Sequence, residues 1–121
     1  MASSPPLAKF DAAAVSVQEY FLPPEKCLAG NPRQRVWNHY TDVTGKFSAG
    51  AWSSERGKWK IAYTEEEYCR IVAGVSVITD SAGQSLTVAA GDQFVVPRGF
   101  TGTWEVIEPT EKTYVIYEAS A

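Results

Sequence analysis

Apolar and polar residues alternate with a period of two along most of the chain after residue 35. The clearest example is the stretch 58–63, where two lysines alternate with Trp59, Ile61 and Tyr63. Alternation of this kind predicts a β-strand with one buried face and one solvent-facing face. Similar patterns predict strands at residues 36–41, 46–53, 68–79, 85–88, 94–96, 103–108 and 113–118. Because no helical periodicity competes with them, we expect an all-β sandwich or barrel.

Glycine and proline residues separate the predicted strands. Within Gly91–Trp104, the sequence Pro97-Arg98-Gly99 predicts a tight corner between two strands, because proline fixes φ at one position and glycine supplies a positive φ at another. Pro109-Thr110 predicts a turn before the last strand. Gly74 lies inside a strand-like run, where a glycine usually marks a bulge or a sharp bend.

The first 34 residues lack this alternation. Pro23-Pro24 ends any helical turn begun in the Ala- and Val-rich run of residues 11–17, and residues 24–32 are expected to be a connection. We therefore expect a single domain in which residues 1–34 form an irregular N-terminal arm and residues 35–121 form the barrel. An open barrel with a trailing arm favours a homodimer.

The composition is typical of a soluble globular protein. The chain has 121 residues, 45% of them hydrophobic and 21% charged, which suits one domain with a single core. No apolar run approaches the roughly 18–20 residues of a membrane helix. The net charge of −3, with scattered basic residues, offers no surface for a phosphate backbone. We expect neither a membrane nor a nucleic acid as partner.

Cysteine and histidine usage narrows the chemistry further. Cys27 and Cys69 are far apart in the sequence, and residues 1–10 lack the apolar segment of a signal peptide. We therefore expect a cytoplasmic protein with free thiols. The only histidine is His39, which excludes a three-histidine zinc site. A lone histidine is more often a structural residue than a ligand.

Two residue spacings resemble the sequence motifs of the cupins, which are small β-barrels of jelly-roll type. Gly91, five residues, Pro97, one residue and Gly99 fit the second cupin motif. Glu67 followed by six residues and Gly74 fits the end of the first motif. The resemblance implies a cupin-type jelly-roll barrel.

The sequence around these motifs resembles that of one cupin subgroup. Residues 47–52 and 102–108 are similar to those of small single-domain proteins related to the cupin domain of ureidoglycine aminohydrolases and to ethanolamine-utilisation cupins. The likeness covers roughly residues 36–118.

The resemblance also shows where a metal site would be. Cupins commonly hold a divalent ion with a His-x-His pair, a glutamate and a third histidine. By the family spacing these positions are occupied by Ile61, Tyr63, Glu67 and Gly102, so only Glu67 keeps a ligand side chain. One carboxylate is too few for a tight site. We expect no metal or other cofactor, with a divalent ion as the less favoured alternative.

Glu67 is the main candidate for chemistry. The alternation that carries Cys69 and Ile71 inward also carries Glu67 inward, and a carboxylate in an apolar barrel is costly unless it is partnered. One interpretation makes Glu67 a general acid/base or a ligand anchor, with Tyr63 beside it. The other makes it a structural glutamate that accepts hydrogen bonds from Tyr or Trp.

Further candidates surround these two residues. Trp59, Trp104 and Tyr63 are expected to line the barrel mouth and to stack on a ligand, unless they only fill the core. Cys69 is a candidate contact, although a packing role is favoured over a nucleophile because no motif places a histidine near it. Lys112 faces either a ligand anion or solvent, and solvent is favoured.

Three functions remain open from the sequence. The leading hypothesis is a small-molecule-binding cupin that holds a small polar ligand without the usual metal. The rival is an enzyme, either a metal-free isomerase-like cupin using Glu67 and Tyr63 or an amidohydrolase-like one. The third is a structural dimer module.

Overall fold

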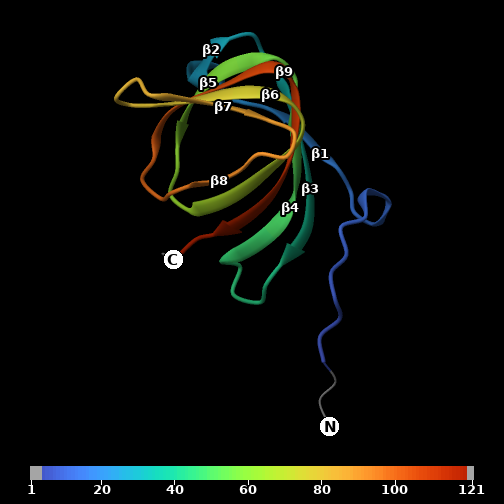
Figure 1. Cartoon of the computed structure of the whole chain (residues 1–121). Coiled ribbons are helices and arrows are strands. Elements are labelled where there is room, and N and C mark those ends of the chain that lie inside the picture. Colours follow the sequence, from blue (N-terminus) through green and yellow to red (C-terminus); the bar gives the residue numbers. More distant parts are fainter. Residues whose placement is uncertain (1–3, 120–121) are drawn as a thin grey trace.

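The computed structural model describes residues 4–119, and strands make up most of them (Figure 1). The strands are β1 (Gln18–Phe21), β2 (Cys27–Ala29), β3 (Arg33–Thr41), β4 (Phe47–Ser54), β5 (Gly57–Ala62), β6 (Glu66–Asp80), β7 (Ser85–Ala89), β8 (Gln93–Val96) and β9 (Thr101–Tyr117). Two short 3₁₀ turns, η1 (Ala12–Ala14) and η2 (Pro24–Lys26), precede β1 and β2. Across residues 4–119, neither is long enough to cross a membrane.

Strand β9 is the centre of the sheet. It pairs with β6 along almost its whole length, while its other edge pairs with β5 over the first half and with β4 over the second. Beyond these strands, β3 and β1 extend the sheet past β4, β2 extends it past β5, and β7 and β8 pair with β6. The sheet curls into an open barrel, so the expected all-β jelly-roll architecture is confirmed (Figure 1).

The corner between β8 and β9 matches its prediction. The Phe100 N–H donates to the Pro97 carbonyl over 3.1 Å, and Gly99 has a φ of 90°. The corner also fixes the loop after β5: the Tyr63 N–H donates to Phe100 O (2.9 Å) and the Gly99 N–H donates to Tyr63 O (2.8 Å). The second cupin motif therefore positions the backbone of Tyr63.

Gly74 and Pro109 meet where β6 and β9 are irregular. The register of the two strands shifts three times between Ile71 and Ser76, which confirms the predicted bulge. The Cα of Gly74 packs so closely against β9 that a Cβ would lie 2.1 Å from the Pro109 carbonyl oxygen. The turn predicted at Pro109-Thr110 is wrong, because the irregular register accommodates a residue without an N–H and the strand continues.

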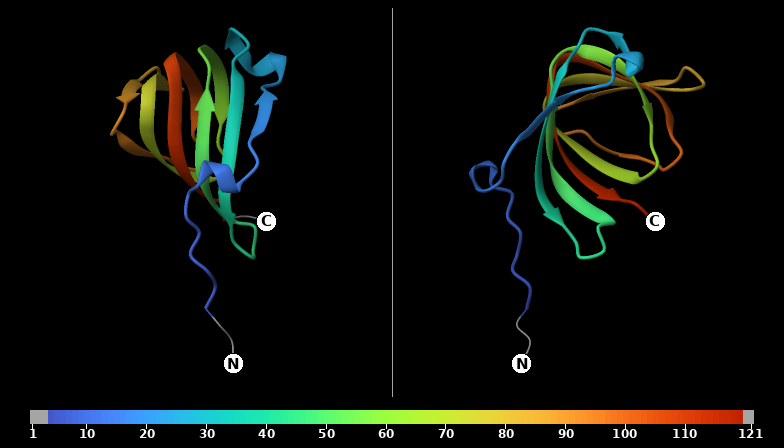
Figure 2. Two further views of the ribbon diagram at one scale, coloured as in Figure 1. Left: turned by 90° about the vertical axis from the view of Figure 1, so that its right-hand side faces the viewer. Right: turned by 180° about the vertical axis from the view of Figure 1, so that it is seen from behind.

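The N-terminal segment is more regular than the sequence indicates. β1 pairs with β3 and β2 pairs with β5, so the connection expected at residues 24–32 contains a strand. Both are edge strands with mostly exposed side chains, which explains why no alternation marks them. Before β1 the chain runs away from the barrel (Figure 2). The division into an arm and a barrel at residue 34 stays a prediction.

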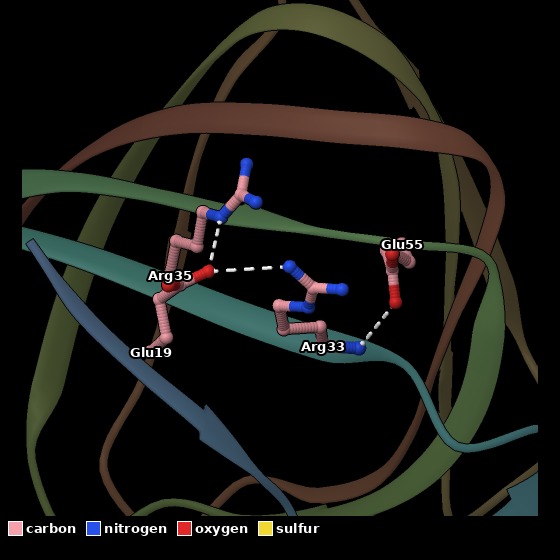
Figure 3. A network of polar contacts seen from close by, with 4 residues as sticks. All are labelled: Glu19, Arg33, Arg35 and Glu55. Carbon is pink, nitrogen blue, oxygen red and sulfur yellow. Dashed lines mark hydrogen bonds and ion pairs between the residues drawn. The ribbon is translucent and has the colours of Figure 1, made fainter.

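Charged side chains link β1 to its neighbouring strand β3 (Figure 3). Glu19 Oε2 lies 2.8 Å from Arg35 Nε and 3.4 Å from an Arg33 guanidinium nitrogen. The hydrogen bond from Arg35 is the main cause that lowers the pKa of Glu19. The backbone N–H of Arg33 donates to Glu55 Oε1 over 2.8 Å. Since all these groups lie near solvent, each contact is individually weak.

The core lies on the inner face of the curled sheet and is built around three tryptophans. Trp52 packs edge-to-face against Trp104, with ring centroids 5.5 Å apart, and against Trp59 at 6.2 Å. All three are at least nine-tenths buried. Ile71, Ile78 and other apolar side chains complete the cluster. The tryptophans also form one wall of a cavity.

Candidate functional site

The open barrel contains a cavity of about 300 Å³. Its walls are mainly aromatic and aliphatic, and a small polar group lies against them. The lining residues are Tyr20, Leu22, Gln34, Val36, Trp52, Trp59, Ile61, Tyr63, Glu65, Glu67, Trp104, Lys112, Tyr114 and Ile116. Concave, mostly apolar sites with a few converging polar groups are typical of small-molecule binding.

Glu67 is the centre of the polar group. Its side chain lies on the inner face of β6 and is 6% exposed. The Tyr63 hydroxyl donates to Glu67 Oε1 over 2.6 Å, and Lys112 Nζ lies 3.2 Å from Glu67 Oε2. Both oxygens of the buried carboxylate therefore have a partner.

Lys112 corrects the expectation from sequence that it faces solvent. Its side chain is 6% exposed, and the ammonium lies 4.6 Å from the ring centroid of Trp52 and 4.4 Å from that of Trp104. Burial acts to lower the pKa of Lys112, but attraction to the Glu67 carboxylate is the main effect that outweighs it, so the pKa is raised. Lys112 is a charged lysine clamped between a carboxylate and two indole faces.

Tyr63 keeps its proton. Burial, followed by the nearby charge of Glu67, raises the pKa of the phenol far above its usual value. A phenol in this state is a hydrogen-bond donor to the carboxylate and a poor base. Of these two hydrogen-bonded residues, only Glu67 could therefore act as a base.

The structure brings five of the six residues singled out from sequence to the cavity wall: Trp59, Tyr63, Glu67, Trp104 and Lys112. The sixth, Cys69, is completely buried behind them. Burial raises the pKa of its thiol to about 12, with Lys112 lowering it and Glu67 raising it further. A thiol so rarely ionised suits packing rather than nucleophilic attack.

Several lining residues were not singled out from sequence. Gln34, Trp52 and Tyr114 all point inward, and the alternation around each could have indicated this. Tyr20 carried no such signal, because it lies on the edge strand β1. The residue as a whole is 40% exposed, but its hydroxyl end lies in the cavity, and the burial of that end is the main cause that raises the pKa of the phenol.

The residues at the usual cupin metal positions do not fit a metal. Ile61 is apolar, and the Tyr63 phenol holds its proton against Glu67. Gly102 leaves no room for a ligand side chain, because a Cβ there would lie 1.9 Å from the Thr79 carbonyl oxygen. Among residues 4–119, no three His, Cys, Asp or Glu side chains are grouped as metal ligands would be.

His39 lies outside the cavity. Its ring stacks on Phe10, with centroids 4.5 Å apart, and its buried Nδ1 has no hydrogen-bond partner within residues 4–119. This contact ties the start of the described chain to β3.

The profile of the EutQ-like cupin domain matches residues 41–114. The chain belongs to the EutQ-like cupin family. This match covers more than half of the chain and includes β4 to β8 and most of β9, with the Glu67–Lys112 pair. The cupin resemblance of the sequence is confirmed. A search of curated proteins found no match.

Solved structures support the same fold. A protein of unknown function of the DUF861 family from Pseudomonas syringae pv. tomato superposes with a TM-score of 0.78 at 22% identity, over 88% of this chain and 46% of that one. The EutQ protein of Clostridium difficile superposes with a TM-score of 0.64 at 15% identity, over 74% of this chain and 65% of that one. A DUF861 family protein from Thermotoga maritima superposes with a TM-score of 0.52 at 30% identity, over 53% of this chain and 73% of that one. The EutQ-like cupin thus spans less than half of the Pseudomonas chain.

Proposed function

We propose that this EutQ-like cupin binds a small polar molecule with a flat or ring-shaped part in the barrel cavity. The observation that carries the proposal is the polar group Tyr63–Glu67–Lys112, held at the wall of a preformed aromatic cavity. The tryptophan rings in the wall can stack on a flat ligand, and the polar group can fix the orientation of that ligand by hydrogen bonds.

The cost of the polar group supports a binding role over simple core filling. Removing two charges from water costs several kcal/mol, and well-packed hydrophobic residues in place of a buried ion pair are often neutral or stabilising. Glu67 and Lys112 are both about nine-tenths buried or more, so they gain little from water. A core without a ligand would be served as well by apolar side chains.

Ligand-induced thermal stabilisation tests the proposal. The protein is screened against carbohydrates, ureides, amides, amines and carboxylates, and hits are measured by calorimetry. A free ligand concentration of a hundred times the Kd raises the free energy of unfolding by about 2.7 kcal/mol, which is readily detected as a thermal shift. We expect Glu67→Gln to lose this shift and the neighbouring Glu66→Gln to keep it, because Glu66 does not line the cavity. If no class of compound shifts the wild-type midpoint, the proposal is wrong.

An acid/base enzyme is the second candidate, favoured by the 2.6 Å contact between Tyr63 and Glu67 at the cavity wall. The carboxylate would act as base and the phenol as proton donor, without a metal. Ammonia release from ureides and amides tests the amidohydrolase-like form, and proton exchange at carbons next to a carbonyl tests the isomerase-like form. In either case Glu67→Gln should abolish turnover while a ligand still binds.

A homodimer is part of the same proposal. Aromatic side chains remain exposed on the outer face of the sheet, including the paired residues Phe47 and Tyr117 and, next to β8, Tyr68. Exposed apolar groups of this kind favour association. Light scattering after size exclusion should give twice the 13.2 kDa of the chain, and a monomer at micromolar concentration would contradict this. We also propose a cytoplasmic location, which cell fractionation tests.

A further inference from the structure

The indole and amide donors around the cavity are mostly bound to acceptors inside the protein. Trp52 Nε1 donates to Gln34 Oε1 over 2.8 Å, and Gln34 Nε2 donates onward to Ser54 Oγ over 2.7 Å. Trp104 Nε1 donates to Ser76 Oγ over 3.1 Å. The two indoles therefore present ring faces to the cavity, with their donors directed elsewhere.

Two of the three lining phenols, Tyr63 and Tyr114, show the same arrangement. Tyr63 donates to Glu67, and the Tyr114 hydroxyl donates to Asn38 Oδ1 over 2.8 Å. A phenol oxygen whose proton is already shared can still accept a hydrogen bond. The phenol oxygens of Tyr63 and Tyr114 can thus accept a hydrogen bond, while their own protons are already shared.

Among the described residues that line the cavity, Lys112 is the one with a positive charge, and that charge is already neutralised. The Lys112 ammonium lies 3.2 Å from Glu67 Oε2. It also lies over two indole rings, with its nitrogen 4.4 and 4.6 Å from their centroids. An anionic ligand would have to compete with Glu67 for Lys112. That exchange would leave a buried carboxylate without its cation, at a cost of several kcal/mol.

Glu65 adds a second carboxylate to the cavity wall. Its Oε2 lies 3.2 Å from the Thr64 hydroxyl, which also contacts Glu118. With Glu65 and Glu67 negative and Lys112 positive, the ionised lining carries a net charge of −1.

We propose that the cavity selects a small organic cation with N–H donors, such as a primary ammonium or a guanidinium, over its neutral and anionic analogues. The inference rests on the proposed binding function and names the ligand class for that site. The acceptor oxygens and the Glu65 carboxylate together match a group that only donates and is positively charged.

The state of Glu65 agrees with this assignment. Burial, and then the neighbouring Glu118 and Glu67, raise the pKa of its carboxyl against the effect of the Thr64 hydroxyl. A bound cation favours the charged form and lowers that pKa again. Where Glu65 is partly protonated in the free protein, binding therefore releases a proton, and in that pH range affinity rises with pH.

Calorimetry with four compounds of similar shape tests the inference. Benzylammonium, benzyl alcohol, benzoate and benzyltrimethylammonium present a donor cation, a neutral group, an anion and a cation without N–H. We expect benzylammonium to bind at least about tenfold more tightly than each of the other three. Tighter binding of benzyl alcohol or benzoate overturns the inference and leaves the proposed function standing. Equal binding of the trimethyl compound overturns the requirement for N–H donors.

The broader ligand screen separates the two failures. If none of the four compounds binds but a carbohydrate or ureide does, the cation inference is wrong and the binding function holds. If nothing in either set binds, the binding function itself is wrong.

A matched pair of variants assigns the effect to Glu65. Glu65→Gln should lower the affinity for benzylammonium by about three- to tenfold and leave the affinity for benzyl alcohol unchanged. Glu66→Gln makes the same change one residue along, at a position that does not line the cavity, and should alter neither. Equal losses for both compounds in Glu65→Gln would overturn the assigned role.

Discussion

The part of the cavity wall formed by β6 and β9 differs sharply from the part formed by β1. β6 and β9 pair from Glu66 to Asp80, and their inner side chains include the fully buried Cys69 and Ile71. β1 has four residues, all exposed, and pairs with β3 alone. Both segments nevertheless give side chains to the same cavity, Lys112 and Glu67 from the first and Tyr20 from the second.

This difference separates the two tasks of a binding site. The buried pair of β6 and β9 can only move if the core opens, so it fixes the orientation of a ligand. β1 is held by main-chain hydrogen bonds and exposed ion pairs, and such regions open with little free energy. Entry and release of a ligand are therefore expected on the β1 side of the cavity.

Thiol reactivity should give the largest contrast between core and edge strands. Cys69 in β6 is completely buried with a pKa of about 12, whereas Cys27 is half-buried in the edge strand β2. At neutral pH a thiol with that pKa is ionised about a thousandfold less than an ordinary cysteine. We expect an aromatic disulfide reagent to modify one thiol per native chain and the second only in denaturant. Rapid native labelling of Cys69 in a Cys27→Ser background would show that β6 opens.

The buried ion pair should account for the largest change in stability. Lys112→Met leaves the Glu67 carboxylate buried without its cation, and such breaks cost about 3–5 kcal/mol. Urea denaturation should show this loss in the free energy of unfolding. The double variant Glu67→Gln/Lys112→Met should recover most of it, because no unpaired charge remains. A single variant as stable as wild type would mean that this wall is not rigid.

Gly74 should be the next most sensitive position in this wall. Gly74→Ala places a methyl group against the Pro109 carbonyl and forces alanine to a φ of 88°, so we expect a loss of about 3 kcal/mol. Gly83 has the same φ of 88°, but a Cβ added there would meet no atom of residues 4–119 within 4 Å, so Gly83→Ala isolates the backbone strain. That control should lose only about 1 kcal/mol. Equal losses would assign the whole effect to strain rather than to the contact of β6 with β9.

The same contrast explains what could be predicted from sequence. Strands with one buried face show an alternation of apolar and polar residues. From this alternation we expected the side chains of Tyr63, Glu67 and Trp104 to face inward, and they do. Lys112 was misjudged because a charged residue next to a glutamate is usually solvent-exposed, and only the pairing of β9 with β4 and β6 turns it inward. β1 was missed because an edge strand held by its main chain needs no apolar pattern.

The strand β1 should show the smallest change, and only locally. Glu19→Gln removes the ion pairs to Arg33 and Arg35 but no buried contact, so the midpoint of global unfolding should stay unchanged. The pKa of Glu19 is lowered in the folded protein, so its contribution is present above the unfolded pKa and is lost as the pH falls through the folded pKa.

Amide hydrogen exchange measures this local effect. In Glu19→Gln the amides of β1 should exchange faster, and those of β6 should not change. In wild type at neutral pH, high salt should have the same effect on β1, because the ion pairs are exposed. Glu25→Gln is the matched control, since Glu25 lies in η2 and forms no ion pair among residues 4–119. Faster exchange in both β1 and β6 would mean that the two walls open together, and the separation of ligand entry from ligand orientation would then be lost.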